Sequence, residues 1–500
     1  TRLVSDWSSD VCSSDLLFLV AVLHFLNALR ILQRQHISAL QLFALSFVGV
    51  IFIGGCLLML PAAREPGTSV TFVDAMFMAA SACCVTGLSL YDIGSQFTLF
   101  GQLVLLTLIQ VGGLGIMTFA AASSVAFGGG MSLRDRVAMG QVLNEVTGKI
   151  GRTVMAILSV TLIAEGLGAL LLFGKWVTVA DGVVTPLPVG EQVYYSIFHS
   201  ISAFCNAGFS LHADSFVRYA GDSRVVLTIS SLVLVGGIGF AVIIDMARYR
   251  PWHSRLARRL PVLSKVAKRK PLPRLSLHTK LVLSVTALLL VGGSVLFWLL
   301  ERERSLAGLD LGSQALTSFY HGGIAPRTVG FNTVDVATLG TPVLFVTILL
   351  MIIGASPGST GGGIKTTSLA VLFLSLWGTL RGRPVEIFKR RIKDQQVSQV
   401  LVLLVIALLL VNGALFVLTM TESHILDRRG GFLALTFETV SAFATVGLST
   451  GVTAELSQAG RVVILLCMFI GRVGPLTLLV ALGAPRPGKY EYPSEQVMLG

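Results

Sequence analysis

Four loops, each built around a single glycine, carry the chemistry that this sequence offers. The glycines recur at intervals of 121, 122 and 117 residues, at Gly87, Gly208, Gly330 and Gly447. An aromatic residue stands ten positions before each glycine and an alanine five positions before, at Phe77, Phe198, Tyr320 and Phe437 and at Ala82, Ala203, Ala325 and Ala442. Serine stands six positions before three of them, and Ile324 is the exception. Four matches without gaps indicate an internal repeat.

Glycine at the same point of four loops suits the binding of a dehydrated cation. A ring of inward-facing carbonyl oxygens replaces the hydration shell of an ion, and glycine reaches the required dihedrals without steric cost. Irregular backbone at membrane depth is tolerated where it lines a water-filled cavity. Short helices that precede the loops would point their negative C-terminal ends at the same axis. The loops therefore predict a cation pathway.

The elements that must position these loops are membrane helices. Apolar residues make up 53% of the 500 residues, charged residues 13%, and the mean hydropathy is +0.79. Soluble domains carry about 25% charged residues, so an ordinary soluble enzyme, a disulfide-stapled secreted domain and a disordered protein are excluded. Eight apolar stretches of spanning length lie near residues 39–60, 99–126, 151–174, 223–247, 277–300, 340–380, 397–420 and 459–482.

We predict an all-α polytopic membrane protein with four pseudo-symmetric helix–pore-loop–helix repeats around one central pore. The repeats are expected at residues 39–126, 151–247, 277–380 and 397–482, with an N-terminal segment at 17–38 and a cytoplasmic tail at 483–500. Residues 1–16 contain the run DWSSDVCSSDL, which resembles the translation of a sequencing-adapter primer. We interpret that stretch as an assembly artefact and leave it out of the fold argument.

The net charge of +12 reflects topology rather than nucleic-acid binding. Of the 38 Lys and Arg residues, 21 lie in the segments 127–152, 247–280 and 381–396, which separate apolar stretches. Basic residues gather in this way in cytoplasmic loops, so these loops are predicted to face the cytoplasm and the glycine loops to open from outside. Anionic lipid or a cytoplasmic partner could also contact these loops.

The glycine loops resemble the four selectivity-filter segments of the Trk/Ktr/HKT superfamily, the membrane subunits of bacterial potassium uptake systems. They read CVTGLS at 84–89, CNAGFS at 205–210, RTVGFN at 327–332 and TVGLST at 445–450. The resemblance covers about residues 39–500, and the ending KYEYPSEQVMLG resembles that of the family. Glycine in all four loops resembles the potassium-selective members. The short N-terminus resembles Ktr-type subunits, with an N-terminally truncated Trk-type chain as the alternative.

The resemblance implies K⁺ as the transported ion and no cofactor held by this chain. It implies potassium binding at the backbone carbonyls of Val85, Thr86, Gly87, Asn206, Ala207, Gly208, Thr328, Val329, Gly330, Thr445, Val446 and Gly447. It also implies a homodimer in the bacterial cytoplasmic membrane and a separate cytoplasmic nucleotide-binding regulatory subunit. Sodium stimulation is implied for Ktr-type members.

A second glycine-rich set follows the loop glycines by 24 to 28 residues, as GGLG at 112–115, GGIG at 236–239, GASPG at 354–358 and GRVG at 471–474. Small residues let membrane helices pack closely, but Pro357 and its neighbouring glycines must break the third helix. The resemblance implies an intramembrane gate there, under the filter. Its predicted residues are Gly354, Ser356, Pro357, Gly358, Ser359, Thr360, Gly361, Gly362, Gly363 and Lys365.

Arg472 lies in the fourth copy of this set, within apolar sequence. An arginine at mid-bilayer is costly unless it faces a cavity or a partner. The resemblance places a matching arginine at the pore constriction, so we predict that Arg472 raises a barrier to cations that movement of the gate lowers. An arginine bound only to backbone carbonyls, for stability, is the alternative. Lys365 belongs to the gate or extends toward the cytoplasmic end.

Other polar residues are weaker candidates. Glu165 is expected to be paired or to join helices, His199 and His321 to pack, and Asp74 to cap a helix. Four acids either concentrate cations at the mouth or form a solvated surface, namely Asp92, Glu301, Asp310 and Asp335.

Two rival functions remain open on the sequence. An ion-coupled secondary transporter of another cation would normally show inverted repeats and intramembrane carboxylates. A membrane enzyme that uses ATP would need a phosphate loop, yet Ile364 stands where the lysine of that motif is required. No nucleophile, general base or metal cluster stands at catalytic spacing, so we predict that the chain is not an enzyme.

Overall fold

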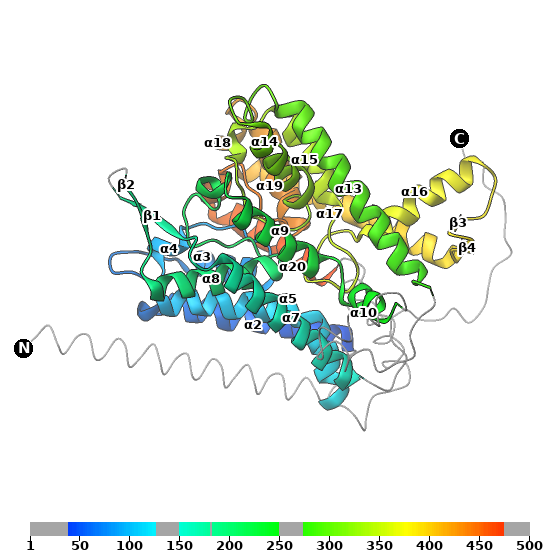
Figure 1. The fold of residues 1–500 in the computed structure, drawn as a ribbon, viewed down its shortest axis with the longest axis horizontal. Helices are drawn as coiled ribbons and strands as arrows, with labels where there is room; N and C mark the ends of the chain where they lie inside the picture. The colour runs from blue at the N-terminus through cyan, green and yellow to red at the C-terminus, as the bar shows by residue number, and fades with distance from the viewer. Residues whose placement is uncertain (1–38, 127–149, 181–182, 250–273, 475–500) are drawn as a thin grey trace, which may run out of the picture.

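The computed structural model describes residues 39–126, 150–180, 183–249 and 274–474, and its regular structure is mainly helical. The segments 1–16, 17–38 and 483–500 lie outside the described residues, as do most of the basic loops 127–152 and 247–280. The described chain forms four successive units, each a long helix, a short helix that ends at a glycine loop, and a second long helix (Figure 1). This order confirms the predicted fold class.

The four units use corresponding helices. The first helices are α2 (Ala39–Met59), α7 (Ile150–Leu172), α13 (Leu277–Glu301) and α17 (Asp394–Thr421). The short helices are α3 (Phe72–Cys83), α8 (Val189–Phe204), α14 (Leu311–Ser318) continued by the π-helix η3 (Phe319–Ile324), and α19 (Gly431–Phe443). The second helices are α5 (Leu99–Ala126), α9 (Ser223–Gly237) with α10 (Phe240–Arg248), α15 (Thr341–Ile352) with α16 (Thr366–Leu380), and α20 (Gln458–Val473).

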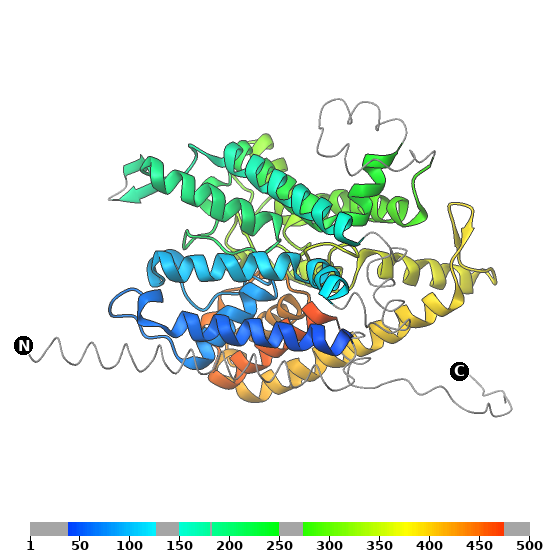
Figure 2. The same ribbon diagram turned by 90° about the horizontal axis from the view of Figure 1, so that it is seen from below.

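Two antiparallel hairpins mark opposite ends of the molecule. They are β1 (Val177–Ala180) with β2 (Val183–Pro186), and β3 (Glu386–Ile387) with β4 (Arg390–Arg391). Figures 1 and 2 show the second hairpin projecting on α16 and α17, away from the first. Single turns complete the described structure, at η1 (Pro61–Ala63), α4 (Ile93–Gln96), η2 (Val217–Tyr219), η4 (Val336–Thr338), α18 (Ser423–Leu426) and η5 (Val452–Glu455).

Three helices in the described part are long and apolar enough to cross a bilayer, namely Met155–Leu172, Leu277–Glu301 and Asp394–Thr421. The span predicted at 340–380 is divided by residues 353–365, as Pro357 and its glycines require. The span predicted at 223–247 differs from expectation, because α9 and α10 meet at 92°. Gly239 has a φ of 95° at this bend, and Phe240 N donates to Gly358 O at 2.9 Å. The bend between α9 and α10 therefore lies where the chain contacts the loop that interrupts the second helix of the third repeat.

The end of each first helix, or the short segment that follows it, is tied to the start of the second helix of its own repeat. The ties run from Thr98 Oγ1 to Ala62 O (2.6 Å), from Lys175 Nζ to Asp222 Oδ2 (2.8 Å), from Gly340 N to Glu301 Oε1 (2.9 Å) and from Ser457 N to Glu422 Oε2 (3.0 Å). Glu301 is fully buried. The expectation that it concentrates cations at the mouth or forms a solvated surface is therefore wrong, because its carboxylate accepts the backbone N–H of Gly340 at the start of α15 and that of Ser305 in the turn after α13.

Candidate functional site

Each glycine loop turns at a residue in the left-handed backbone conformation, two positions before the glycine. These residues are Val85, Asn206, Thr328 and Thr445, with φ of 57°, 62°, 66° and 52°. A positive φ is an outlier for a β-branched side chain, and such strain persists only where the surrounding structure enforces it. The four loops therefore share this strained turn residue.

In the three loops that have serine six positions before the glycine, the backbone carbonyl of that serine accepts an N–H group of the turn. The backbone N–H groups of Thr86, Ala207 and Val446 donate to the carbonyls of Ser81, Ser202 and Ser441 at 2.8, 2.7 and 2.8 Å. In the third loop Ile324 takes the place of serine, the short helix ends as a π-helix, and Val329 N donates to Ala325 O at 3.3 Å. The exception in the sequence thus coincides with a difference in structure.

The four glycines close into a ring, each lying against the next. A methyl group built on Gly87 would strike Ala207 and Gly208, one on Gly208 would strike Gly330, one on Gly330 would strike Gly447, and one on Gly447 would strike Thr86 and Gly87. Gly87, Gly208 and Gly447 also have φ of 94°, 71° and 87°. Gly330 does not have a positive φ, so only space demands glycine there. The structure therefore brings the predicted glycines together around one axis.

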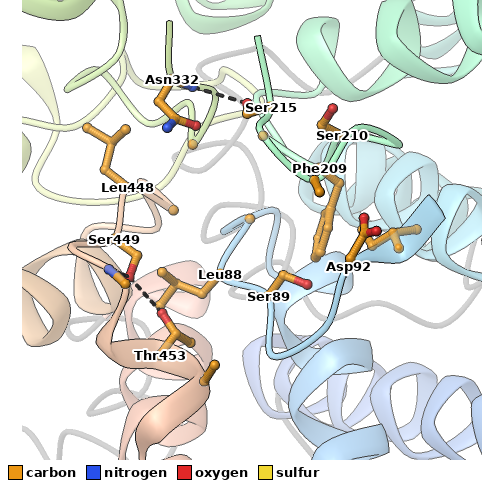
Figure 3. Close-up of a pocket in the computed structure, with 18 of the residues that line it drawn as sticks. Leu88, Ser89, Asp92, Phe209, Ser210, Ser215, Asn332, Leu448, Ser449 and Thr453 are labelled. Carbon is orange, nitrogen blue, oxygen red and sulfur yellow. Dashed lines mark hydrogen bonds between the residues drawn. The ribbon is translucent and has the colours of Figure 1, made fainter. Parts of the chain in front are cut away.

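A cavity of about 360 Å³ opens on one side of this ring and includes all four glycines in its lining (Figure 3). We call this cavity the vestibule. Asp92 and Asp335 line it, and each accepts a backbone N–H at the start of a short helix, from Gly94 at 3.3 Å and from Ala337 at 3.0 Å. Two of the four predicted acids therefore line this cavity, whereas Asp310 caps α14 and is not part of the lining.

The loop at residues 354–365 lies on the other side of the turns. Successive residues of this loop face successive repeats: the Thr360 hydroxyl lies 3.3 Å from Asn206 Oδ1, and methyl groups built on Gly361 and Gly362 would strike Thr328 and Thr445. Backbone bonds fasten the loop to α9, from Ser356 N to Gly237 O at 3.1 Å and from Thr360 N to Gly236 O at 3.2 Å. The predicted gate residues therefore cross beneath three of the four turns.

Arg472 links this loop to the first repeat. Its guanidinium donates to Thr360 O in the loop and to Gly112 O in α5, and its side chain is buried. Lys365 donates to Gly361 O at 2.7 Å and to Gly362 O at 3.3 Å. The alternative that Lys365 extends toward the cytoplasmic end is therefore wrong, because its ammonium group folds back onto carbonyls of the predicted gate loop.

The glycines of the second set explain how the inner helices come this close. A methyl group built on Gly112, Gly236 or Gly471 would strike the carbonyl of Cys83, Phe204 or Phe443, the last residue of the short helix in the same repeat. In the third repeat, the corresponding Gly354 lies instead against Gly362 and Gly363. The loop thus occupies in the third repeat the place where a helix packs in the others.

Comparison with known proteins decides the family. The TrkH family of cation transport proteins matches residues 19–488. The chain belongs to this family. The Ktr system potassium uptake protein B of Vibrio alginolyticus is 40% identical over 92% of this chain and 94% of that protein. Its counterpart in Bacillus subtilis is 37% identical over 92% and 96%, and the potassium/sodium uptake protein NtpJ of Enterococcus hirae is 33% identical over 93% and 98%.

The crystal structure of the potassium transporter TrkH from Vibrio parahaemolyticus has the same fold, with a TM-score of 0.65 and 19% identity over 89% of this chain and 84% of that chain. Membership of the TrkH family confirms the resemblance seen in the glycine loops. It also confirms that the chain is a membrane transport protein rather than an enzyme.

A supporting position that sequence reasoning missed lies nine residues before each loop glycine. Leu90 N lies 3.5 Å from Met78 Sδ, Leu211 N donates to His199 Nε2 at 3.2 Å, and Thr333 N donates to His321 Nε2 at 3.0 Å. Each donor is three residues after its glycine. In the fourth repeat Glu438 holds this position and accepts from the Thr453 hydroxyl. The two histidines were expected only to pack, whereas each accepts a backbone N–H from the segment that follows its glycine.

Two arginines were also missed. Arg327, directly before the third turn, is buried and donates to Thr286 Oγ1 at 3.2 Å, while its Nε and Nη1 have no partner among the described residues. Arg461 on α20 pairs with Asp74 at 2.5 Å, and Asp74 also forms the predicted capping box with Thr71. A charge within apolar sequence was the available signal for both. Glu165 is buried as expected and accepts from Gln110 Nε2 at 3.4 Å.

Proposed function

We propose that this chain is the membrane subunit of a potassium uptake system and conducts K⁺ through the ring of Gly87, Gly208, Gly330 and Gly447. The closed ring at the floor of the vestibule carries this proposal. In this proposal the four loops, which share a strained turn residue two positions before each glycine, turn backbone carbonyls toward one axis, an arrangement that suits a dehydrated cation. The names of the Ktr relatives, which are potassium uptake proteins, support K⁺ as the ion.

The same proposal assigns the carbonyls of residues 85–87, 206–208, 328–330 and 445–447 to ion binding and the 354–365 loop to gating. Thr360, Gly361 and Gly362 lie under three turns, so an ion that leaves the ring meets this loop. Arg472 holds Thr360 O against α5 and adds positive charge beside the exit. Release of this contact would remove both the obstruction and the electrostatic barrier.

Topology and assembly complete the proposal. The basic segments 127–152, 247–280 and 381–396 face the cytoplasm of a bacterium, so the vestibule opens outside and inward flow follows the electrochemical gradient. The chain works as a homodimer with a separate cytoplasmic nucleotide-binding subunit that contacts these segments. Sodium stimulates transport, in keeping with the name of the potassium/sodium relative.

Growth of a bacterium that lacks its potassium importers tests this function. We expect the chain, expressed with and without a Ktr regulatory subunit, to restore growth at low potassium and to take up rubidium. Gly330→Ser should relax selection of potassium over sodium, and Arg472→Ala should raise basal flux. Gly413→Ser, in open space on α17, and Arg428→Ala, on the surface, are matched controls. A well-expressed parent that takes up no rubidium with either partner condition contradicts the proposal.

A further inference from the structure

Glu438 is a buried carboxylate that the ion pathway does not use. The Glu438 side chain is fully buried, and its Oε2 atom has no hydrogen-bond partner among the described residues. The equivalent side chains of the other three repeats, Met78, His199 and His321, carry no formal negative charge and each meet a backbone N–H. An ionised carboxylate with one hydroxyl donor and no positively charged partner is strongly unfavourable in the interior. A positive ligand or a proton must therefore neutralise it.

The arginines on the elements around α19 are engaged elsewhere. Arg461 pairs with Asp74, Arg428 pairs with Glu455, and Arg472 donates to backbone carbonyls. Glu438 forms no ion pair with any lysine or arginine in the part of the chain that the structure describes. The positive charge must therefore come from outside this set of side chains.

A path of oxygen atoms leads from Glu438 to the vestibule. Thr453 Oγ1 contacts Glu438 Oε1 and lies 2.9 Å from Ser449 Oγ, and Ser449 in turn accepts from Gly451 N at 2.9 Å. Ser449 and Thr453 line the vestibule, and Figure 3 shows their hydroxyls joined beside the cavity. A hydroxyl has one hydrogen, so Ser449 donates to Thr453 and Thr453 donates to an ionised Glu438.

This arrangement leaves oxygen lone pairs free on three neighbouring groups. Ser449 and Thr453 each keep one free acceptor position, and Glu438 keeps Oε2. A carboxylate with two hydroxyl oxygens is a set of hard ligands, which suits hard cations rather than soft metals. Ser449 and Thr453 line the cavity that leads to the glycine ring, with Glu438 directly behind Thr453, so cations on the proposed pathway pass beside this set.

We propose that Glu438, Ser449 and Thr453 form a side-chain site for a partly dehydrated alkali cation in the wall of the vestibule, beside the fourth loop. The site rests on the proposed potassium pathway and deepens it, since a cation held there lies next to the entrance. The cation and not a proton neutralises Glu438. Occupancy therefore fixes the Thr453–Ser449 contact and, through it, the segment that follows Gly447 in the fourth loop.

Cation-dependent stability of the purified full chain tests the site. The protein is kept in choline chloride, and NaCl or KCl is added in separate titrations while the thermal unfolding midpoint is recorded. We expect one of the two cations to stabilise the parent, and Glu438→Gln to raise its half-saturating concentration at least tenfold. Glu455→Gln makes the same chemical change at a carboxylate whose side chain is 41% exposed and should titrate like the parent.

Thr453→Val is a second variant, to be used if Glu438→Gln fails to fold. It removes one proposed ligand and keeps the carboxylate. An unchanged titration in either folded variant overturns the site. Stabilisation of the parent by lower pH in choline alone, lost in Glu438→Gln, assigns the free oxygen to a proton and also overturns it. Rubidium uptake is measured separately. If the parent takes up no rubidium but is still stabilised by the cation, the potassium pathway is refuted. If the parent takes up rubidium but Glu438→Gln titrates like the parent, only this site is refuted.

Discussion

The ion pair between Asp74 and Arg461 closes the ring of repeats where no peptide does. Covalent segments join the first repeat to the second, the second to the third and the third to the fourth, but the fourth meets the first only by contact. Arg461 Nη1 on α20 lies 2.5 Å from Asp74 Oδ1 on α3, and the side chains are 20% and 2% exposed. Asp74 also accepts from the Tyr91 hydroxyl at 2.7 Å. We predict that this pair couples the two repeats energetically.

The burial of the two partners sets the expected magnitude. Loss of one partner of a buried pair costs about 3–5 kcal/mol, because the other charge remains uncompensated. Arg461 retains some access to solvent, so Asp74→Asn should cost about 2–3 kcal/mol. In Arg461→Gln the carboxylate keeps Tyr91 and the capping box, and the cost should be about 2 kcal/mol. Contacting residues of this kind show coupling of about 1–2 kcal/mol.

A double-mutant cycle measures this coupling. The free energy of unfolding is determined by denaturant titration of the parent, both single variants and the double variant in detergent. The double variant should lose about 1–2 kcal/mol less than the sum of the single losses. Costs that add within about 0.5 kcal/mol would show that the two charges act independently, and the closing role assigned to them would be refuted.

Three further predictions concern the glycine ring, the loop and the vestibule. Gly447→Ala should lower rubidium uptake at least tenfold, because Gly447 has a φ of 87° and its methyl would strike Thr86; Gly413→Ala should match the parent. Thr360→Val removes a hydroxyl 3.2 Å from Phe204 O, worth about 1 kcal/mol, so basal uptake should rise about fivefold; unchanged uptake would remove that hydroxyl from the gate. Burial, and then the charge of Arg218, lower the pKa of His212 to about 4. Histidine in the unfolded chain has a pKa of about 6.5, so the unfolded chain binds the proton first as the pH falls. The free energy of unfolding should therefore decrease by about 3 kcal/mol between pH 6.5 and pH 4. His212→Gln should remove most of this decrease in a denaturant titration at each pH.

The sequence alone determined the repeat and what each repeat contains. Hydropathy and the spacing of the four loop glycines depend only on local composition and order, so they predict the helix, short helix and helix of every unit. Pro357 with its glycines predicts the break at residues 353–365 for the same reason, because a helix interior excludes them locally. The exceptional Ile324 also marked the one loop whose short helix differs.

Only the tertiary structure decided which groups meet. Arg472 and Gly112 are 360 positions apart, and Arg461 and Asp74 are 387 apart, so no periodic pattern in one segment records either contact. The bend at Gly239 depends on a loop more than 100 residues later. Glu438 looks like any acid in a short helix until burial removes its solvent and leaves one oxygen without a partner. Local chemistry selects the elements, whereas the partners of buried charges depend on how distant elements pack.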